Sequence, residues 1–149
     1  MHFGINKLVI SLCFTLGCYS LFSQPRLSLV GPNQARIGMS TTATVQIISS
    51  SIHGPARASI DIPQGWSLEN YPGESASVSQ TGSQIKIVWL EFPIRDTLEV
   101  VFLLKIPESA NKGTYAISGY FDYISEGKAK KLAIPAHSYK VLKYYTRVQ

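Results

Sequence analysis

Apolar and polar residues alternate along most of the chain with a period of two. Successive side chains of a β-strand point to opposite faces, so this alternation is the pattern of strands that are buried on one side. In the run QIKIVWL (84–90), for example, Ile85, Ile87 and Trp89 share one face. The pattern predicts seven to nine short strands among the segments 26–30, 41–49, 56–62, 66–68, 75–80, 84–90, 96–106, 114–124, 129–134 and 139–145.

The segment 96–106 (DTLEVVFLLKI) departs from simple alternation. Every second residue from Leu98 to Ile106 is apolar, and Val101 and Leu103 are apolar on the opposite side. A strand that is apolar on both sides is typical of the middle of a sheet with both faces covered. We therefore expect this strand to be central and buried on both faces.

These strands predict an all-β fold. Beyond residue 23, no stretch of twelve or more residues combines helical periodicity with capping residues. Short strands separated by turns in about 126 residues are typical of an immunoglobulin-like antiparallel β-sandwich, and a small β-barrel is the alternative. We find neither an internal repeat nor a linker, so residues 24–149 are expected to form a single domain.

The first 23 residues have the layout of a secretory signal peptide. A short segment with one cation (1–7) precedes an apolar run of ten residues, LVISLCFTLG (8–17). This run is too short to span a bilayer, which needs roughly 20 apolar residues. The small side chain of Ser23 predicts cleavage between Ser23 and Gln24. We thus expect an exported protein that is periplasmic, extracellular or associated with an outer membrane.

Cys18 leaves an alternative open, because a lipoprotein is acylated on a cysteine directly after such an apolar run. Gly17 suits this alternative, whereas Thr15 stands where leucine is usual. Both cysteines of the chain, Cys13 and Cys18, precede the expected cleavage site. The mature chain would then hold no disulfide and no thiolate, and its core alone would stabilise it.

Composition agrees with one folded domain. The 149 residues are 45% hydrophobic and 15% charged, which excludes a disordered tail and a bundle of membrane helices. We expect no transmembrane segment in the mature chain.

Three motifs carry a resemblance. The turn IPQGW (62–66), the strand KIVW (86–89) followed by Pro93, and the strand GTYAISGYFDY (113–123) occur in this order. In this respect the chain resembles a family of small exported sandwich domains of Gram-negative bacteria, mostly of unassigned function. The PQGW turn alone also resembles immunoglobulin-like modules appended to secreted glycoside hydrolases. The resemblance implies a sandwich fold and export, and it implies no activity and no site residue.

The sequence offers no catalytic, cofactor-binding or metal-binding residue. After residue 23 the histidines are His53 and His137, and the nine acidic residues are scattered. We find none of the motifs of a zinc protease, a serine hydrolase or a phosphate-binding loop. The protein is therefore expected not to be an enzyme and to need no cofactor.

Aromatic residues give one candidate binding site. Trp66 and Tyr71 lie near turns, and exposed aromatic rings there would stack on the apolar faces of a glycan. The alternative for Trp66 is packing at the edge of the core. Trp89 is in phase with Ile85 and Ile87, so we expect it in the core.

Basic residues near the C-terminus give the second candidate binding site. After Gly127 the chain carries six cations and no acid, namely Lys128, Lys130, Lys131, Lys140, Lys143 and Arg147. As one basic face they would bind an acidic polysaccharide or an acidic protein. They would equally protect an exposed strand edge from aggregation, as lysines commonly do. Export argues against nucleic acid as the partner.

The sequence as a whole predicts an exported, non-catalytic binding or structural domain of the cell envelope that acts through protein–protein contact. The expected partner is an envelope or secreted protein, or a surface polysaccharide. A carbohydrate-binding module that uses exposed aromatic residues is the first alternative, and a hydrolase is the less favoured second one.

Overall fold

The computed structural model describes residues 24–50, 52–70 and 76–143, which form ten strands and contain no helix. The strands are β1 (Arg26–Val30), β2 (Gln34–Arg36), β3 (Ser40–Ile48), β4 (Ala56–Asp61), β5 (Ser67–Asn70), β6 (Ser77–Thr81), β7 (Gln84–Trp89), β8 (Thr97–Lys105), β9 (Gly113–Ser125) and β10 (Lys128–Leu142).

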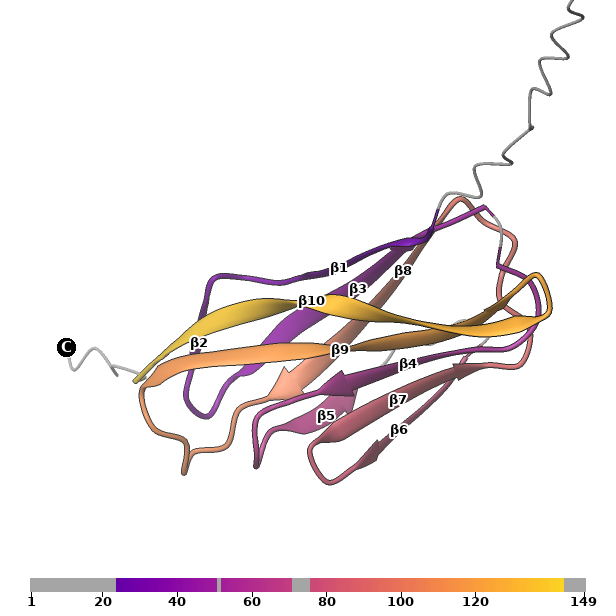
Figure 1. Cartoon of the computed structure of the whole chain (residues 1–149). Helices are drawn as coiled ribbons and strands as arrows, with labels where there is room; N and C mark the ends of the chain where they lie inside the picture. Colours follow the sequence, from indigo (N-terminus) through magenta and orange to yellow (C-terminus); the bar gives the residue numbers. More distant parts are fainter. Residues whose placement is uncertain (1–23, 51, 71–75, 144–149) are drawn as a thin grey trace, which may run out of the picture.

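The strands form two sheets that pack face to face (Figure 1). One sheet has four strands in the order β1-β3-β8-β5, and the other has six in the order β2-β10-β9-β4-β7-β6. The pairing is antiparallel except between β2 and β10, which run parallel. Two separate sheets confirm the expected sandwich and exclude the barrel alternative.

One hydrophobic core fills the space between the sheets, and the alternation in the sequence accounts for it. In β3, β4, β7 and β8, the apolar residues at every second position are buried. Trp89 is one of these buried residues, as expected. Burying apolar side chains on the inner face of each strand is the main source of stability in such a sandwich.

The strand count exceeds the expected seven to nine. Strand β2 has only three residues, and nothing in so short a segment distinguishes it from a loop. The segments 129–134 and 139–145, which we expected to be separate, share one strand, β10, up to Leu142. An irregularity between Ile134 and His137 interrupts the pairing of β10 with β9, and it contains Pro135, which has no backbone N–H to donate.

Strand β8 is central, as expected, but it is not covered on both faces. It lies between β3 and β5, and its inner residues are buried. On its outer face Val101 is 38% exposed, and Leu103 is only partly buried. The expectation of double coverage was wrong because the sandwich has only two layers, so the described residues place no third layer on this face.

The two ends of the sandwich are built differently, and we name them for what they carry. The hairpin end holds the turn between β9 and β10, and the Tyr139 end lies at the opposite ends of these strands (Figure 1). At the Tyr139 end, the rings of Trp66, Tyr115 and Tyr139 are in contact, with centroids 5.7 and 5.8 Å apart. At the hairpin end, the aromatic cluster consists of Trp89, Phe92, Phe121 and Tyr123.

Hydrogen bonds between the sheets close the Tyr139 end. The buried hydroxyl of Tyr139 on β10 donates to the carbonyl oxygen of Thr42 on β3, at 2.9 Å. The amide of Gln80 on β6 accepts from the backbone N–H of Leu68 and donates to the carbonyl oxygen of Trp66. Burial disfavours the phenolate and raises the pKa of Tyr139 to about 12.

Candidate functional site: an apolar hollow at the hairpin end

The structure does not support a sugar-binding platform built on Trp66. Its side chain is only 2% exposed, because it packs between Tyr115 and Tyr139 in the core. A ring in this position presents no face to a glycan, so Trp66 takes the alternative role of core packing. The other candidate, Tyr71, lies outside the described residues.

The structure describes five of the six C-terminal cations and separates these five into two groups rather than placing them on one face. Lys128, Lys130 and Lys131 lie at the hairpin end of β10, whereas Lys140 and Lys143 lie at the Tyr139 end. Lys128 and Lys140 are twelve residues apart on one strand, which at 3.3 Å per residue places them roughly 40 Å apart. Arg147 lies outside the described residues. The cations therefore cannot contact one small partner surface together.

The three lysines of the hairpin end lie on a strand segment with one open side. Strand β2 pairs only with residues 140–142 of β10, so the rest of β10 pairs with β9 alone within the described residues. Lysines on such an edge hinder pairing with another sheet. This placement agrees with the protective role, and the surface next to these lysines points to a further one.

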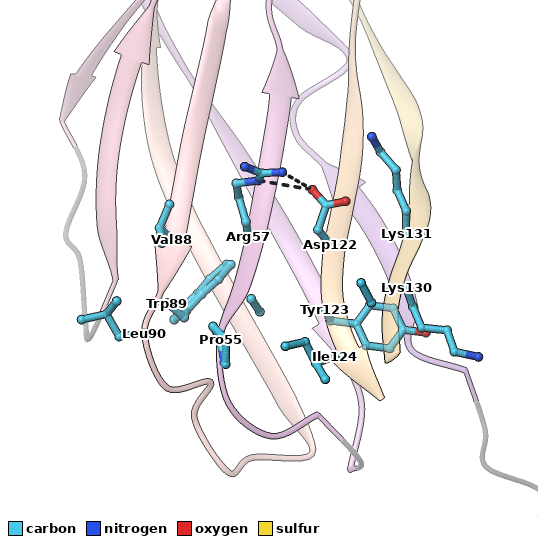
Figure 2. Close-up of a pocket in the computed structure, with 12 residues that line it drawn as sticks. Pro55, Arg57, Val88, Trp89, Leu90, Asp122, Tyr123, Ile124, Lys130 and Lys131 are labelled. Carbon is cyan, nitrogen blue, oxygen red and sulfur yellow. Dashed lines mark hydrogen bonds and ion pairs between the residues drawn. The ribbon is translucent and has the colours of Figure 1, made fainter. Parts of the chain in front are cut away.

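A hollow of about 490 Å³ opens beside these lysines (Figure 2). It crosses the ends of four neighbouring strands, β7, β4, β9 and β10. The register of these strands arranges its twelve lining residues in three rows across the sheet: Leu90, Pro55, Ile124 and Ala129; then Trp89, Ala56, Tyr123 and Lys130; then Val88, Arg57, Asp122 and Lys131.

The row at the end of the sheet is wholly apolar. In the middle row Trp89, Ala56 and Tyr123 are buried and belong to the core. Alternation along each strand therefore turns the two outer rows toward solvent. Leu90 is 85% exposed and Ile124 is 38% exposed, so this row leaves apolar surface in contact with water. Contiguous exposed apolar surface of this kind commonly marks an interaction site.

The charges of the hollow are unevenly placed. Its one acid, Asp122, is paired with Arg57 at 3.1 Å. Lys130 and Lys131 have no carboxylate partner among the described residues, and the ammonium of Lys131 lies 4.9 Å from the ring centre of Tyr120. Figure 2 shows Val88 and Leu90 of the β7 side on one flank and the two lysines of β10 on the other. The hollow thus has an apolar side and a cationic side.

Sequence reasoning named the lysines of this site and missed its apolar half. A signal was present, because Leu90 and Ile124 are large aliphatic residues out of phase with the buried residues next to them. Each stands directly after a buried aromatic residue at the end of its strand, which turns it outward. Single exposed apolar residues are common on protein surfaces, so this signal becomes informative only when the fold brings Leu90 and Ile124 into one row.

The described residues show no other chemistry at this end. No three of their His, Cys, Asp and Glu side chains gather as a metal site requires. Across residues 24–50, 52–70 and 76–143, no helix is long and apolar enough to cross a membrane.

Comparisons with known proteins agree with this fold. No protein-family model and no curated protein matches the sequence. Among solved structures, a non-cellulosomal cohesin of the archaeon Archaeoglobus fulgidus is similar with a TM-score of 0.60 and 14% identity, over 80% of this chain and 92% of that chain. The collagen-binding subdomain of the Enterococcus faecalis surface protein ACE is similar with a TM-score of 0.50 and 13% identity, over 80% and 97%.

A longer structure matches over part of its length. The collagen-binding domain of the Erysipelothrix rhusiopathiae surface protein RspB gives a TM-score of 0.57 and 12% identity, and the match covers 76% of this chain and 45% of that chain. Identities this low show a common fold alone. The protein is an immunoglobulin-like β-sandwich of the kind found in cohesins and in collagen-binding domains.

Proposed function

We propose that this protein is an exported, non-catalytic domain of the cell envelope that binds another protein through the hollow at the hairpin end. The observation that carries the proposal is the exposed apolar row beside two lysines that have no carboxylate partner. A partner that covers Leu90 and Ile124 removes apolar surface from water, which is the main driving force of protein association.

The named functions of the similar structures support a binding role. A cohesin and two collagen-binding domains of bacterial surface proteins share this fold. The fold hosts many functions, so this support is an analogy, and the site itself makes the stronger argument.

The binding role is tested by capture from an envelope extract of the source organism. The bait is the purified protein, compared with Leu90→Asn and with Ile94→Asn. Leu90 and Ile94 are equally exposed, at 85%, in the same connection between β7 and β8, but only Leu90 lines the hollow. We expect one specific protein that the wild type and Ile94→Asn retain and Leu90→Asn loses. Equal retention by all three, or retention of polysaccharide alone, contradicts the proposal.

Export is tested by the mass of the protein recovered from the envelope fraction. We expect the chain to begin at Gln24, as cleavage after Ser23 produces. A mass that corresponds to a chain beginning at an acylated Cys18 would show lipid anchoring in place of cleavage after Ser23. That result would still agree with export. Recovery of the uncleaved chain from the cytoplasm would contradict export.

A further inference from the structure

We infer that the hollow binds an extended segment of the partner that carries an aliphatic residue and an acidic residue about four positions apart. This inference rests on the proposed function, and it adds the chemistry and the spacing of the partner segment.

The apolar side of the hollow requires the aliphatic residue. Val88 of β7 and Leu90, directly after β7, line this side, and Pro55 and Ile124 extend the apolar surface toward β9. This surface offers no charged partner, because Asp122 and Arg57 are paired with each other. An aliphatic side chain enters here without leaving any polar group of its own unsatisfied.

The cationic side requires the acidic residue. Lys130 and Lys131 both line the hollow and lack a carboxylate partner among the described residues. Lys131 lies in the outward row beside Asp122, whereas Lys130, one residue earlier on the strand, faces the other side of the sheet. A carboxylate of the partner at this position therefore gains the positive charge of Lys131. A basic segment would meet these lysines with like charge, so charge complementarity selects an acidic one.

The geometry of the sheet sets the spacing between the two residues. From β10 to β7 there are three steps between neighbouring strands, which at about 4.8 Å each span roughly 14 Å. An extended chain advances about 3.3 Å per residue. The aliphatic and acidic residues of a segment that crosses the hollow are thus about four positions apart.

The inference is tested by selecting random linear peptides displayed on phage against the immobilised protein. Parallel selections use Leu90→Asn and its matched control Ile94→Asn. We expect the wild type and the control to enrich peptides that combine an aliphatic and an acidic residue at a fixed spacing near four. We expect Leu90→Asn to bind the enriched peptides roughly tenfold more weakly.

The lysines are tested separately with two matched double variants of the same charge. Lys130→Gln/Lys131→Gln should lower the affinity for the selected peptides and reduce the salt dependence of their binding. Lys140→Gln/Lys143→Gln should leave both the affinity and its salt dependence unchanged. Replacing the acidic residue of the peptide by its amide should weaken binding to the wild type and not to the first variant.

The outcomes separate this inference from the proposed function. Enriched peptides that depend on Leu90 but carry no acidic residue, or no fixed spacing, overturn the inference and retain the hollow as a protein-binding site. Peptides that bind all variants equally, or a selection that enriches none, overturn both.

Discussion

The two ends of the sandwich have similar buried aromatic clusters, but they differ in the residues that surround these clusters. At the Tyr139 end, Tyr139 of β10 donates a hydrogen bond to the backbone of β3, and Gln80 of β6 donates one to the carbonyl oxygen of Trp66, just before β5. The buried ring of Trp66 contacts the rings of Tyr115 and Tyr139.

At the hairpin end, the cluster around Trp89 is as well buried, yet the next row outward exposes Leu90 and Ile124. Exposed apolar residues occur at the Tyr139 end too, such as Met39 at 48%, but Leu90 and Ile124 lie in one row of a single hollow. Their grouping in that hollow supports the contact proposed at the hairpin end.

The largest expected effect lies at the Tyr139 end. Trp66→Ala leaves a cavity between Tyr115 and Tyr139 and should lower the free energy of unfolding by about 3 to 5 kcal/mol. Urea denaturation followed by circular dichroism measures it. At the hairpin end, Leu90→Asn should change the stability by no more than about 0.5 kcal/mol. Equal losses for the two variants would contradict the contrast between a closed and an open end.

High pH should reveal the same contrast. An unfolded tyrosine has an ordinary pKa near 10, whereas burial raises the pKa of Tyr139 to about 12. Between these values the unfolded chain releases a proton that the folded chain keeps, so stability falls as the pH rises. The loss should reach roughly 2 kcal/mol by pH 12 and be negligible below about pH 9.

Tyr139→Phe is the control for this pH dependence. At neutral pH it should cost about 1 kcal/mol, because the hydrogen bond to Thr42 is lost. Above pH 10 its stability should fall less steeply than that of the wild type. Burial raises the pKa of Tyr123 at the hairpin end in the same direction, so the variant retains part of the pH dependence. Identical slopes for the variant and the wild type would show that Tyr139 does not titrate as described.

Binding should depend on the hairpin end alone. Leu90→Asn should weaken binding of the captured partner roughly tenfold, which corresponds to about 1.4 kcal/mol. Met39→Asn, an exposed apolar residue at the Tyr139 end, should have no effect. Calorimetric titration measures both, and a comparable loss for Met39→Asn would remove the distinction between the ends.

The smallest expected effect concerns the lysines. Lys130→Gln/Lys131→Gln should weaken partner binding at low salt about threefold to tenfold, in line with rim charges that contribute modestly. High salt should abolish the difference from the wild type. A difference that persists at high salt would mean that the lysines act through packing and not through charge.

Most of the fold followed from local patterns in the sequence. Alternation alone places Ile85, Ile87 and Trp89 in the core, and it locates nearly all strands. Two features of the strands were not predicted, and each has a physical reason. A three-residue strand such as β2 has no periodicity to detect, and the length of β10 depends on a tolerated irregularity around Pro135.

The site was less predictable because it depends on register between strands that are distant in sequence. Pro55, Leu90 and Ile124 belong to three different strand ends, and only the order β7-β4-β9 brings them into one row. The reverse holds for the cations, which are close in sequence but lie along a strand that extends them to opposite ends. The cations are close in sequence but distant in the structure, so the prediction of one basic face was wrong. The residues of the apolar row are distant in sequence, so the sequence did not indicate that they lie together.

The parallel pairing of β2 with β10 has a consequence for how the chain folds. Gln34 and Lys140 are partners although about a hundred residues separate them. The backbone bonds that join these segments, from Lys140 to Asn33 and from Ile37 to Leu142, form only when β10 is in place. A chain that emerges from its N-terminus onward cannot complete this sheet edge until almost all of it has emerged. Such delayed closure is compatible with the proposed export, in which the chain crosses a membrane before it folds.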